Sequence, residues 1–213
     1  MTINSMQKNG LILAAFAVIA TALVVGVQVL TKDKIAQQQQ AQVLRTLNQL
    51  IPPAMHDNDL YQSCRLVTHN ALGSNEPHPM YRAWVNDKPT ALAAEIVAPD
   101  GYSGAIRLLL AVKPSGELLG IRTLRHQETP GLGDKIEIEK NDWITSFSGK
   151  QVKSDDDNRW AVKRDGGMFD QFTGATITPR AVVGAVKRAT LYLEENANTL
   201  FNAELQHCQE AAQ

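Results

Sequence analysis

One short stretch of this 213-residue chain combines an accessible hydroxyl with very small neighbours. It runs from Asp170 to Pro179 and reads Asp-Gln-Phe-Thr-Gly-Ala-Thr-Ile-Thr-Pro. Gly174 and Ala175 carry almost no side chain, so the hydroxyl of Thr176 would be open to a reagent as bulky as another enzyme. The stretch therefore contains a candidate site for covalent modification of a threonine.

A helix is expected directly after this stretch. Thr178 suits an N-cap and Pro179 suits the first helical position, where a missing N–H costs nothing. The amides and the positive dipole end of a helix over residues 180–196 would then point back at Thr176, which favours a bound phosphate. A well-capped surface helix after a flexible loop would produce the same pattern without any function.

Two further loops carry residues that could form a site. The first, Gly101 to Ile106, is a glycine-bearing turn in which Tyr102 could be a ligand or a packing residue. The second, His126 to Lys135, contains Pro-Gly and Gly-x-Gly and mixes titratable with flexible residues. A functional loop is plausible there, and a plain surface loop fits equally well.

The composition excludes several classes of function. The net charge of −1 offers no electrostatic case for binding nucleic acid. Two cysteines, Cys64 and Cys208, are too few and too far apart for an iron–sulfur cluster or a structural zinc site. No Gly-x-Gly-x-x-Gly follows a strand and no Walker A loop is present. A redox group would have to be held in another way, and covalent attachment is one.

The N-terminal part predicts a membrane anchor. Residues 1–9 form a short polar tail, and residues 10–30 contain no charged side chain. At about 1.5 Å per residue, this run spans a hydrocarbon core of about 30 Å. A cleaved signal peptide would have a shorter apolar region and a cleavage site of small residues, and Val27-Gln28-Val29-Leu30 offers none. We therefore predict a retained single-pass helix.

A stalk helix is predicted after the anchor. Apolar residues keep approximately helical spacing between Ile35 and Ile51, and Pro52-Pro53 stops the pattern. We assign residues 31–59 to this juxtamembrane segment and residues 60–213 to the folded domain.

Charge alone leaves the orientation in the membrane open. Lys8 lies on one side of the anchor, and Lys32, Lys34 and Arg45 lie on the other. The positive-inside rule would favour a cytoplasmic main domain, but that rule weakens when a long domain follows the anchor.

The folded domain is predicted to be α+β. Five segments with β-rich or alternating patterns are separated by short turns, at residues 64–68, 80–85, 91–98, 105–113 and 118–124. Strands in series joined by short turns favour an antiparallel sheet. Helices are expected at residues 139–147 and from residue 179 to about residue 209.

These motifs resemble those of the FMN-binding domain family. Its flavin-attachment motif, Asp-x-x-Ser/Thr-Gly-Ala-Thr, is matched at Asp170, Thr173, Gly174, Ala175 and Thr176. The Gly-Tyr-x-Gly turn, the Glu-Thr-Pro-Gly-Leu-Gly loop and the N-terminal anchor occur in the order typical of the G subunit of the Rnf/Rsx membrane electron-transport complex. The C subunit of the sodium-translocating NADH:quinone oxidoreductase is a more distant relative. The resemblance covers nearly the whole chain.

The resemblance implies a covalent cofactor. FMN would be joined by a phosphoester bond to Thr176 by a flavin transferase that uses FAD as donor, and Asp170 would belong to the motif that this enzyme recognises. The residues implied to lie near the flavin are Tyr102, Gly104, Glu128, Thr129, Gly131, Leu132 and Gly133. No catalytic residue and no metal site are implied. The domain would lie on the periplasmic side of the bacterial inner membrane.

The physical chemistry of the residues agrees with that implication. A phosphodiester keeps one negative charge, which a helix beginning near Pro179 can stabilise. Attachment through the phosphate leaves the isoalloxazine ring unaltered, so the protein orients it and tunes its potential. His126 or Lys135 could stabilise a reduced flavin or could be solvated loop residues. Asp134 and Lys135 could equally form a local ion pair.

The two cysteines suggest a disulfide. In an oxidising compartment, Cys64 and Cys208 would tie the C-terminal segment to the start of the domain, and two unrelated thiols are the alternative.

The function predicted overall is an electron-relay subunit in a complex that couples redox chemistry to ion transport. An anchored assembly or binding subunit whose threonine is never modified is the alternative, and a free-standing flavin reductase is disfavoured because no convincing acid–base pair is present.

Overall fold

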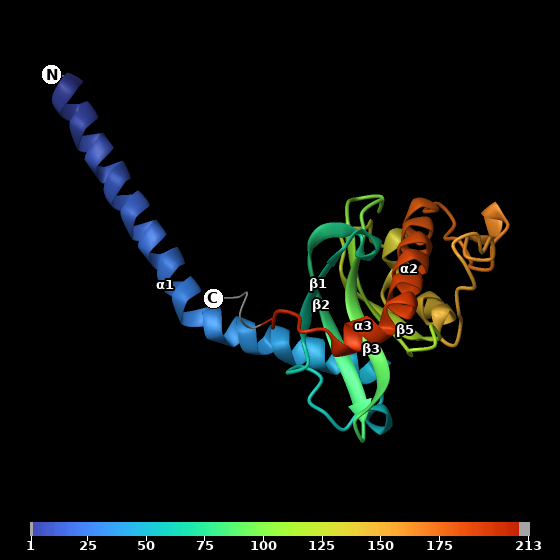
Figure 1. The fold of residues 1–213 in the computed structure, drawn as a ribbon. Coiled ribbons are helices and arrows are strands. Elements are labelled where there is room, and N and C mark those ends of the chain that lie inside the picture. The colour runs from blue at the N-terminus through green and yellow to red at the C-terminus, as the bar shows by residue number, and fades with distance from the viewer. Residues whose placement is uncertain (1, 209–213) are drawn as a thin grey trace. The chain divides into compact units, whose positions relative to one another are not determined.

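The computed structural model describes residues 2–208, apart from the side chains of residues 2–6, 33, 36 and 39. The chain divides into two compact units, residues 1–43 and residues 44–213. The first unit is helical, and the second contains an antiparallel sheet followed by helices (Figure 1). This mixed arrangement confirms the predicted α+β class.

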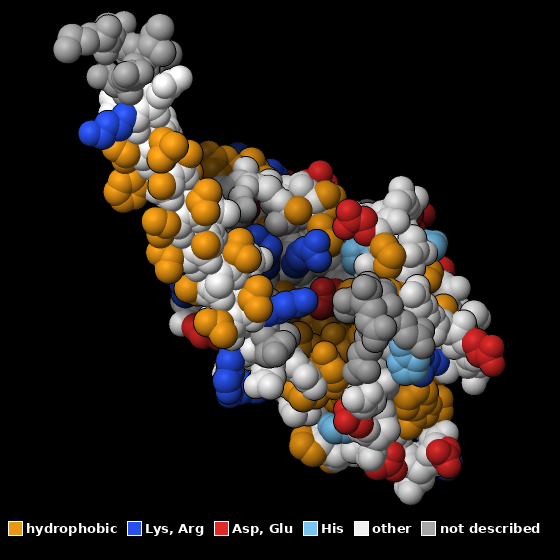
Figure 2. Space-filling model, turned by 90° about the vertical axis from the view of Figure 1, so that its left-hand side faces the viewer, with side chains coloured by type: hydrophobic (Ala, Val, Ile, Leu, Met, Phe, Trp, Pro, Cys, Tyr) orange, Lys and Arg blue, Asp and Glu red, His pale blue; other side chains and the backbone are white. Residues whose placement is uncertain are grey.

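Helix α1 covers residues Thr2–Leu50. Within the described part of the chain, one helical span, Gln7–Lys32, is long and apolar enough to cross a membrane, and none of it is buried. Its exposed Leu, Val, Ile and Phe side chains cover the surface of this helix (Figure 2). α1 continues into the predicted stalk segment, residues 31–59, and ends at Leu50, before the two prolines that cannot continue it. Residues Pro53–Met55 of that segment form a 3₁₀ helix instead.

The sheet in the second unit is a five-stranded antiparallel meander in the order β1-β2-β3-β4-β5. Its strands are β1 (Arg65–His69), β2 (Ser74–Val85), β3 (Lys88–Ala98), β4 (Ile106–Val112) and β5 (Leu118–Arg125). Asn86 and Asp87 connect β2 to β3 with φ angles of 50° and 60°, the left-handed conformation that tight hairpins need and that Asn and Asp tolerate. Four of the strands begin and end within three residues of their predicted bounds, and β2 begins six residues earlier than predicted.

One face of the sheet forms the main core. Every second directly paired position of β3 and β4, such as Ile96 with Leu108, lies on this face, and these side chains are completely buried. Helix α2 (Ile177–Glu195) packs over it with Val182, Val186 and Leu193, all completely buried (Figure 1). Each such side chain contributes about 1.5–3 kcal/mol by leaving water. This packing holds the start of α2 at a defined place beside the sheet.

The last turn of α1 belongs to the second unit and covers part of the opposite face. Leu47 and Leu50 are buried there. A Cβ at Gly120 of β5 would come within 2.9 Å of Leu50 Cδ2, so the missing side chain lets the helix approach. Arg122 Nε also donates a hydrogen bond to Gln49 Oε1 at 3.1 Å.

The structure corrects three expectations about the helices. Residues 139–147 do not form an α-helix; residues Asp142–Phe147 form a 3₁₀ helix (η4) capped by the Asn141 side chain. The C-terminal helix ends at Glu195, and α3 (Ala197–Asn202) is followed by non-helical chain in the described residues up to 208. Residue 209, the predicted end, lies outside the described residues.

The third correction concerns the start of α2. Thr176 occupies the N-cap position and Pro179 is the third helical residue, so Thr178 is not the N-cap. Pro179 is tolerated there because the first turn has no intrahelical acceptors for its N–H groups. The Thr178 hydroxyl donates to Glu128 instead of capping the helix.

The C-terminal segment returns to the first strand. Cys64 and Cys208 form a disulfide that closes a sequence separation of 144 residues. Next to it, Leu66 N–H donates to Gln206 O at 2.9 Å, and Arg65 Nη1 lies 2.9 Å from His207 Nδ1. The described residues contain no free cysteine.

Candidate functional site

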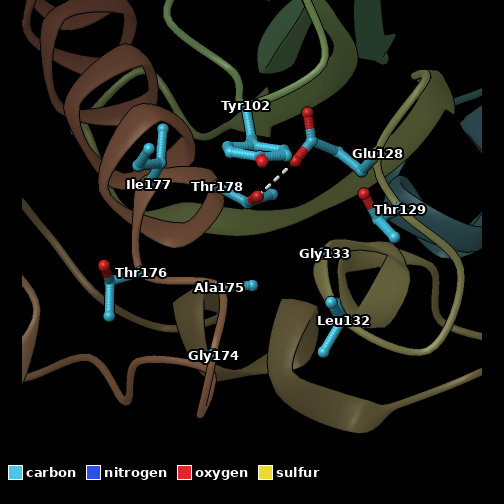
Figure 3. Close-up of a pocket in the computed structure, with 10 residues that line it drawn as sticks. All are labelled: Tyr102, Glu128, Thr129, Leu132, Gly133, Gly174, Ala175, Thr176, Ile177 and Thr178. Atoms are coloured by element: carbon cyan, nitrogen blue, oxygen red, sulfur yellow. Dashed lines mark hydrogen bonds between the residues drawn. The ribbon is translucent and has the colours of Figure 1, made fainter.

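Three segments far apart in the chain line one cavity of about 290 Å³. They are the turn between β3 and β4, the loop after β5, and the start of α2 with the turn before it. Figure 3 shows Tyr102, Thr178 and Glu128 on one side of the space and Leu132 across from them. The lining residues are Tyr102, Glu128, Thr129, Leu132, Gly133, Gly174, Ala175, Thr176, Ile177 and Thr178.

Glu128 joins these three segments. Its Oε1 accepts a hydrogen bond from the Ser103 N–H at 3.0 Å, and its Oε2 accepts one from the Thr178 hydroxyl (Figure 3). Its own N–H donates to His126 Nδ1 at 3.0 Å. Glu128 is 4% exposed and Thr178 is fully buried, so water cannot easily replace either of them as a hydrogen-bond partner. The carboxylate therefore fixes the two loops and α2 relative to one another.

Gly133 makes room for this hydrogen-bonded group. A Cβ at this position would lie 2.8 Å from Glu128 Oε2 and 2.9 Å from Thr178 Oγ1. Any side chain would displace the carboxylate or the start of α2. The second glycine of the Gly-Leu-Gly sequence is thus required by the packing of the cavity wall.

A tight turn presents the residues just before α2. Ala175 N–H donates to Phe172 O at 3.1 Å, and Gly174 between them has a φ of +81°, which favours glycine. The base of the turn is held by Trp143 of η4, whose Nε1 donates to Asp170 O at 2.7 Å. The Trp143 ring also meets the Phe172 ring edge-on at 5.0 Å. The tip of the turn is consequently exposed while its base is anchored.

Thr176 lies where this turn becomes helix α2. Its side chain is half-buried and does not cap the helix. The hydroxyl makes no hydrogen bond to any residue that the structure describes. Figure 3 shows it at the foot of α2, away from the bond between Thr178 and Glu128. A free hydroxyl thus adjoins the first backbone N–H groups of a helix, which have no intrahelical acceptor.

The cavity has an apolar rim. In the second unit, the large apolar side chains that the structure describes as exposed are Tyr102 at 66%, Leu132 at 43% and Ile177 at 45%. All three line the cavity. An apolar cavity with small residues in its floor suits a flat aromatic group better than a charged one.

Acidic residues behind the loop are neutralised by Lys140. Its Nζ lies 2.9 Å from both Asp134 Oδ2 and Glu137 Oε1. Hydrogen bonding to Lys140 holds the pKa of Asp134 and of Glu137 below the usual range, and His126 adds to the effect on Glu137. The sequence had suggested an ion pair between Asp134 and Lys135 as one alternative. In the structure Asp134 pairs with Lys140 instead.

The two cations suggested for a reduced flavin do not line the cavity. His126 has both ring nitrogens engaged, Nδ1 by the Glu128 N–H and Nε2 by Glu137 at 2.7 Å. Lys135 lines a separate hollow of about 450 Å³ beside η4. His126 therefore holds the loop in place through its two hydrogen bonds.

Most residues singled out in the sequence gather at the cavity. Eight of them line it, namely Tyr102, Glu128, Thr129, Leu132, Gly133, Gly174, Ala175 and Thr176. Gly104 and Gly131 instead allow the positive φ angles, 123° and 78°, of their turns. Asp170 and Thr173 line the separate hollow together with Trp143, and the Asp170 carboxylate pairs with Lys163 at 2.6 Å.

The sequence reasoning missed Ser103, Ile177, Thr178 as a lining residue, and Trp143. Thr178 was assigned to capping, and nothing local distinguishes a capping hydroxyl from one that binds a distant carboxylate. Ile177 carried no sequence signal, since its exposure beside the cavity is visible only in the structure.

Comparison with known proteins identifies the domains. Residues 1–50 match the family described as the RnfG N-terminal region, and residues 101–190 match the FMN-binding domain family. The second match includes all three segments of the cavity.

Full-length relatives match with high identity. The G subunit of the ion-translocating oxidoreductase complex of Vibrio atlanticus is 54% identical over 198 residues, which cover 93% of this chain and 95% of the relative. The corresponding protein of Shewanella baltica is 53% identical over 203 residues, with 95% and 96% covered, and that of Shewanella oneidensis is also 53% identical over 203 residues. Identity at this level over nearly the whole length of both proteins shows that the chain belongs to the family of G subunits of ion-translocating oxidoreductase complexes.

Proposed function

We propose that the chain carries FMN, linked by a phosphoester bond to Thr176, and relays electrons within an ion-translocating membrane complex. The observation that carries the proposal is the free Thr176 hydroxyl at the N-terminus of α2, beside an apolar cavity. The FMN-binding domain match over residues 101–190 and the names of the relatives support the cofactor and the complex.

The residues present fit the phosphate of FMN. A phosphodiester on Thr176 would carry one negative charge at a helix end where the N–H groups of Ile177 and Thr178 lack intrahelical acceptors. Pro179, the third helical residue, contributes no N–H, so the interaction depends on these two amides and on the helix dipole.

The residues also fit the flavin ring. Tyr102, Leu132 and Ile177 supply apolar surface, and Gly133, Gly174 and Ala175 leave space between them. We assign Glu128 a positioning role because its bonds to Ser103 and Thr178 hold the cavity walls together. Thr129 supplies a polar group at the edge, while Gly104 and Gly131 shape the two loops. Bound FMN would supply reversible electron transfer, and this chain would orient it and limit its contact with water.

Maturation would require a flavin transferase that acts on the Asp170–Thr176 motif. The Thr176 oxygen would form a bond to the FMN phosphorus of FAD, the pyrophosphate bond would break, and AMP and a proton would leave. The exposed tip of the turn at Thr173 and Gly174 makes this motif accessible to such an enzyme.

We propose a periplasmic location for the domain. Residues 10–30 would form the anchor within α1, residues 31–59 the juxtamembrane segment, and residues 60–213 the FMN-binding domain. The disulfide between Cys64 and Cys208 supports this side, because disulfides persist in the oxidising periplasm and are rare in the cytosol. Other membrane subunits would supply the ion path and the remaining redox centres.

Flavin fluorescence in a denaturing gel tests the attachment. Wild type, Thr176→Ala and Thr199→Ala, an exposed position in α3 outside the motif, are each coexpressed with a flavin transferase and exported, and peptide mapping by mass spectrometry locates any adduct. We expect fluorescence in wild type, none in Thr176→Ala, and an adduct on residue 176 in Thr199→Ala. A dark wild-type band, with the transferase active on a control substrate, would favour the alternative of an anchored assembly subunit without a cofactor.

A further inference from the structure

Two arginines face each other where β4 begins and β5 ends. Arg107 of β4 pairs directly with Arg125 of β5. The register of these strands shifts between Arg107 and Leu108, and this irregularity brings Arg125, instead of Leu124, opposite Arg107. Like charges directly opposite each other on neighbouring strands are destabilising. The local irregularity therefore creates an unfavourable pair that regular pairing would have avoided.

Within the part of the chain that the structure describes, neither arginine has a direct acidic partner. Both side chains are exposed, and neither forms an ion pair or a hydrogen bond with a described residue. Glu95 of β3 and His78 of β2 lie within electrostatic reach of Arg107. Burial raises the pKa of Glu95 against the opposing effect of Arg107, and burial lowers the pKa of His78. The half-buried Glu95 carboxyl is thus a weak counter-charge for two guanidinium groups.

The two arginines line a hollow of about 210 Å³ whose other lining residues are Ala105, His126 and Gln127. No acidic side chain is among them. Both nitrogens of His126 are engaged by Glu128 and Glu137, so the donors left for a ligand are the two guanidinium groups and the Gln127 amide. A small concave site with these donors has the chemistry of an anion site.

We propose that this hollow binds an oxyanion group, a carboxylate or a phosphate, between Arg107 and Arg125. A guanidinium presents its N–H groups in a planar fork that matches the two oxygens of such a group. An anion placed between the arginines would also cancel the repulsion that their register creates. The proposal stands apart from flavin attachment, since it uses none of the residues that line the larger cavity.

The hollow lies directly beside two loops of the larger cavity. Ala105 directly follows Gly104 in the first loop of the larger cavity, and Gln127 directly precedes Glu128 in the second. An acidic side chain of a neighbouring protein that entered the hollow would dock beside that cavity. A small free anion is the other source of the same chemistry.

Stability measurements on the full-length protein in detergent test the proposal. The Tm is measured with and without inorganic phosphate at constant ionic strength, for wild type, Arg107→Gln, Arg125→Gln and Arg188→Gln. Arg188 is an exposed arginine on α2 and serves as a matched control for the loss of one charge. We expect phosphate to raise the Tm of wild type and of Arg188→Gln, and binding to weaken about tenfold or more in the other two variants.

Without phosphate, we expect the substitution of an arginine to leave the Tm unchanged or to raise it. At low ionic strength, Arg125→Gln should be as stable as wild type or more stable, because the repulsion is relieved. A loss of stability there would mean that the guanidinium already has a partner in the protein, and it would overturn the proposal. Equal phosphate effects on all four proteins, an adventitious ion only, would overturn it as well.

A peptide of glutamates used as competitor distinguishes the two sources. If the peptide reduces the phosphate effect on the Tm of wild type but not of Arg125→Gln, the site accepts a protein carboxylate as a ligand. Phosphate binding without competition by the peptide would support the site and assign it to small anions. Neither result depends on whether Thr176 carries a flavin.

Discussion

Two buried threonines on α2 allow a direct measurement of what the Glu128 contact contributes. Thr178 and Thr190 are both completely buried. The Thr178 hydroxyl donates to Glu128 Oε2. The Thr190 hydroxyl has no hydrogen-bond partner among the described residues. Thr→Val removes the hydroxyl at each position and keeps a β-branched side chain, so the change in side-chain entropy is small.

The two substitutions should change the free energy of unfolding with opposite signs. A hydrogen bond to a charged group contributes about 1.5–3 kcal/mol. Thr178→Val removes one and leaves a buried carboxylate oxygen without that donor, so we expect a loss of about 2 kcal/mol. Thr190→Val removes a buried polar group that has no partner, and we expect no change or a gain of up to about 1 kcal/mol.

Unfolding can be followed by tryptophan fluorescence, since Trp84, Trp143 and Trp160 all lie in the second unit. In a domain of this size, 1 kcal/mol corresponds to about 2–4 °C in Tm, so the two variants should differ by about 4–12 °C. The full-length protein is used in detergent with the disulfide intact. Equal stability of Thr178→Val and wild type, or an equal loss in both variants, would refute the reasoning about the Glu128 contact.

Three further predictions concern the support of the site and the fold. Trp143→Phe removes the hydrogen bond to Asp170 O and should slow flavin loading in a time course, whereas Trp160→Phe, which loses a similar bond to Gln151 O at 3.3 Å, should load at the wild-type rate. Equal loading rates in both would contradict the anchoring role. Replacing Cys64 and Cys208 by Ser should lower the free energy of unfolding by about 2–4 kcal/mol, and reductant should then affect wild type but not the variant. Arg159 holds the pKa of Asp157 well below its usual range, so that pair stabilises the protein above the unfolded pKa of about 3.9 and loses this effect as the pH falls. Asp157→Asn should therefore be less stable than wild type at neutral pH, and a Tm series should show the difference shrinking in acid; a constant difference would contradict this cause.

Much of the fold could be predicted because its signals are local. The strands carry β-rich or alternating patterns between turns, and Asn86-Asp87 suits a tight hairpin in any context. Pro52 ends α1 because a proline cannot donate its N–H or fit the preceding turn. Residues 139–147 were expected to be helical, and such a short segment does not distinguish an α-helix from the 3₁₀ helix that residues Asp142–Phe147 form.

The candidate site shows the same division between local and distant causes. The Asp170–Thr176 motif and the two glycine-bearing loops were visible as residue types at fixed spacing, without knowledge of the fold. That they share one cavity depends on α2 packing over the sheet and on Glu128 reaching Ser103 and Thr178.

The sequence by itself determined the apolar N-terminal helix, the strand segments joined by short turns and the candidate acceptor threonine, because each follows from residue types within a short window, and the order of its motifs along the chain indicated the family. Only the tertiary structure decided that Thr176 is the N-cap, that Thr178 binds Glu128, and that Arg125 lies opposite Arg107. Each of these depends on contacts between residues distant in the chain. Which partner a hydroxyl or a guanidinium finds is set by the packing of whole elements.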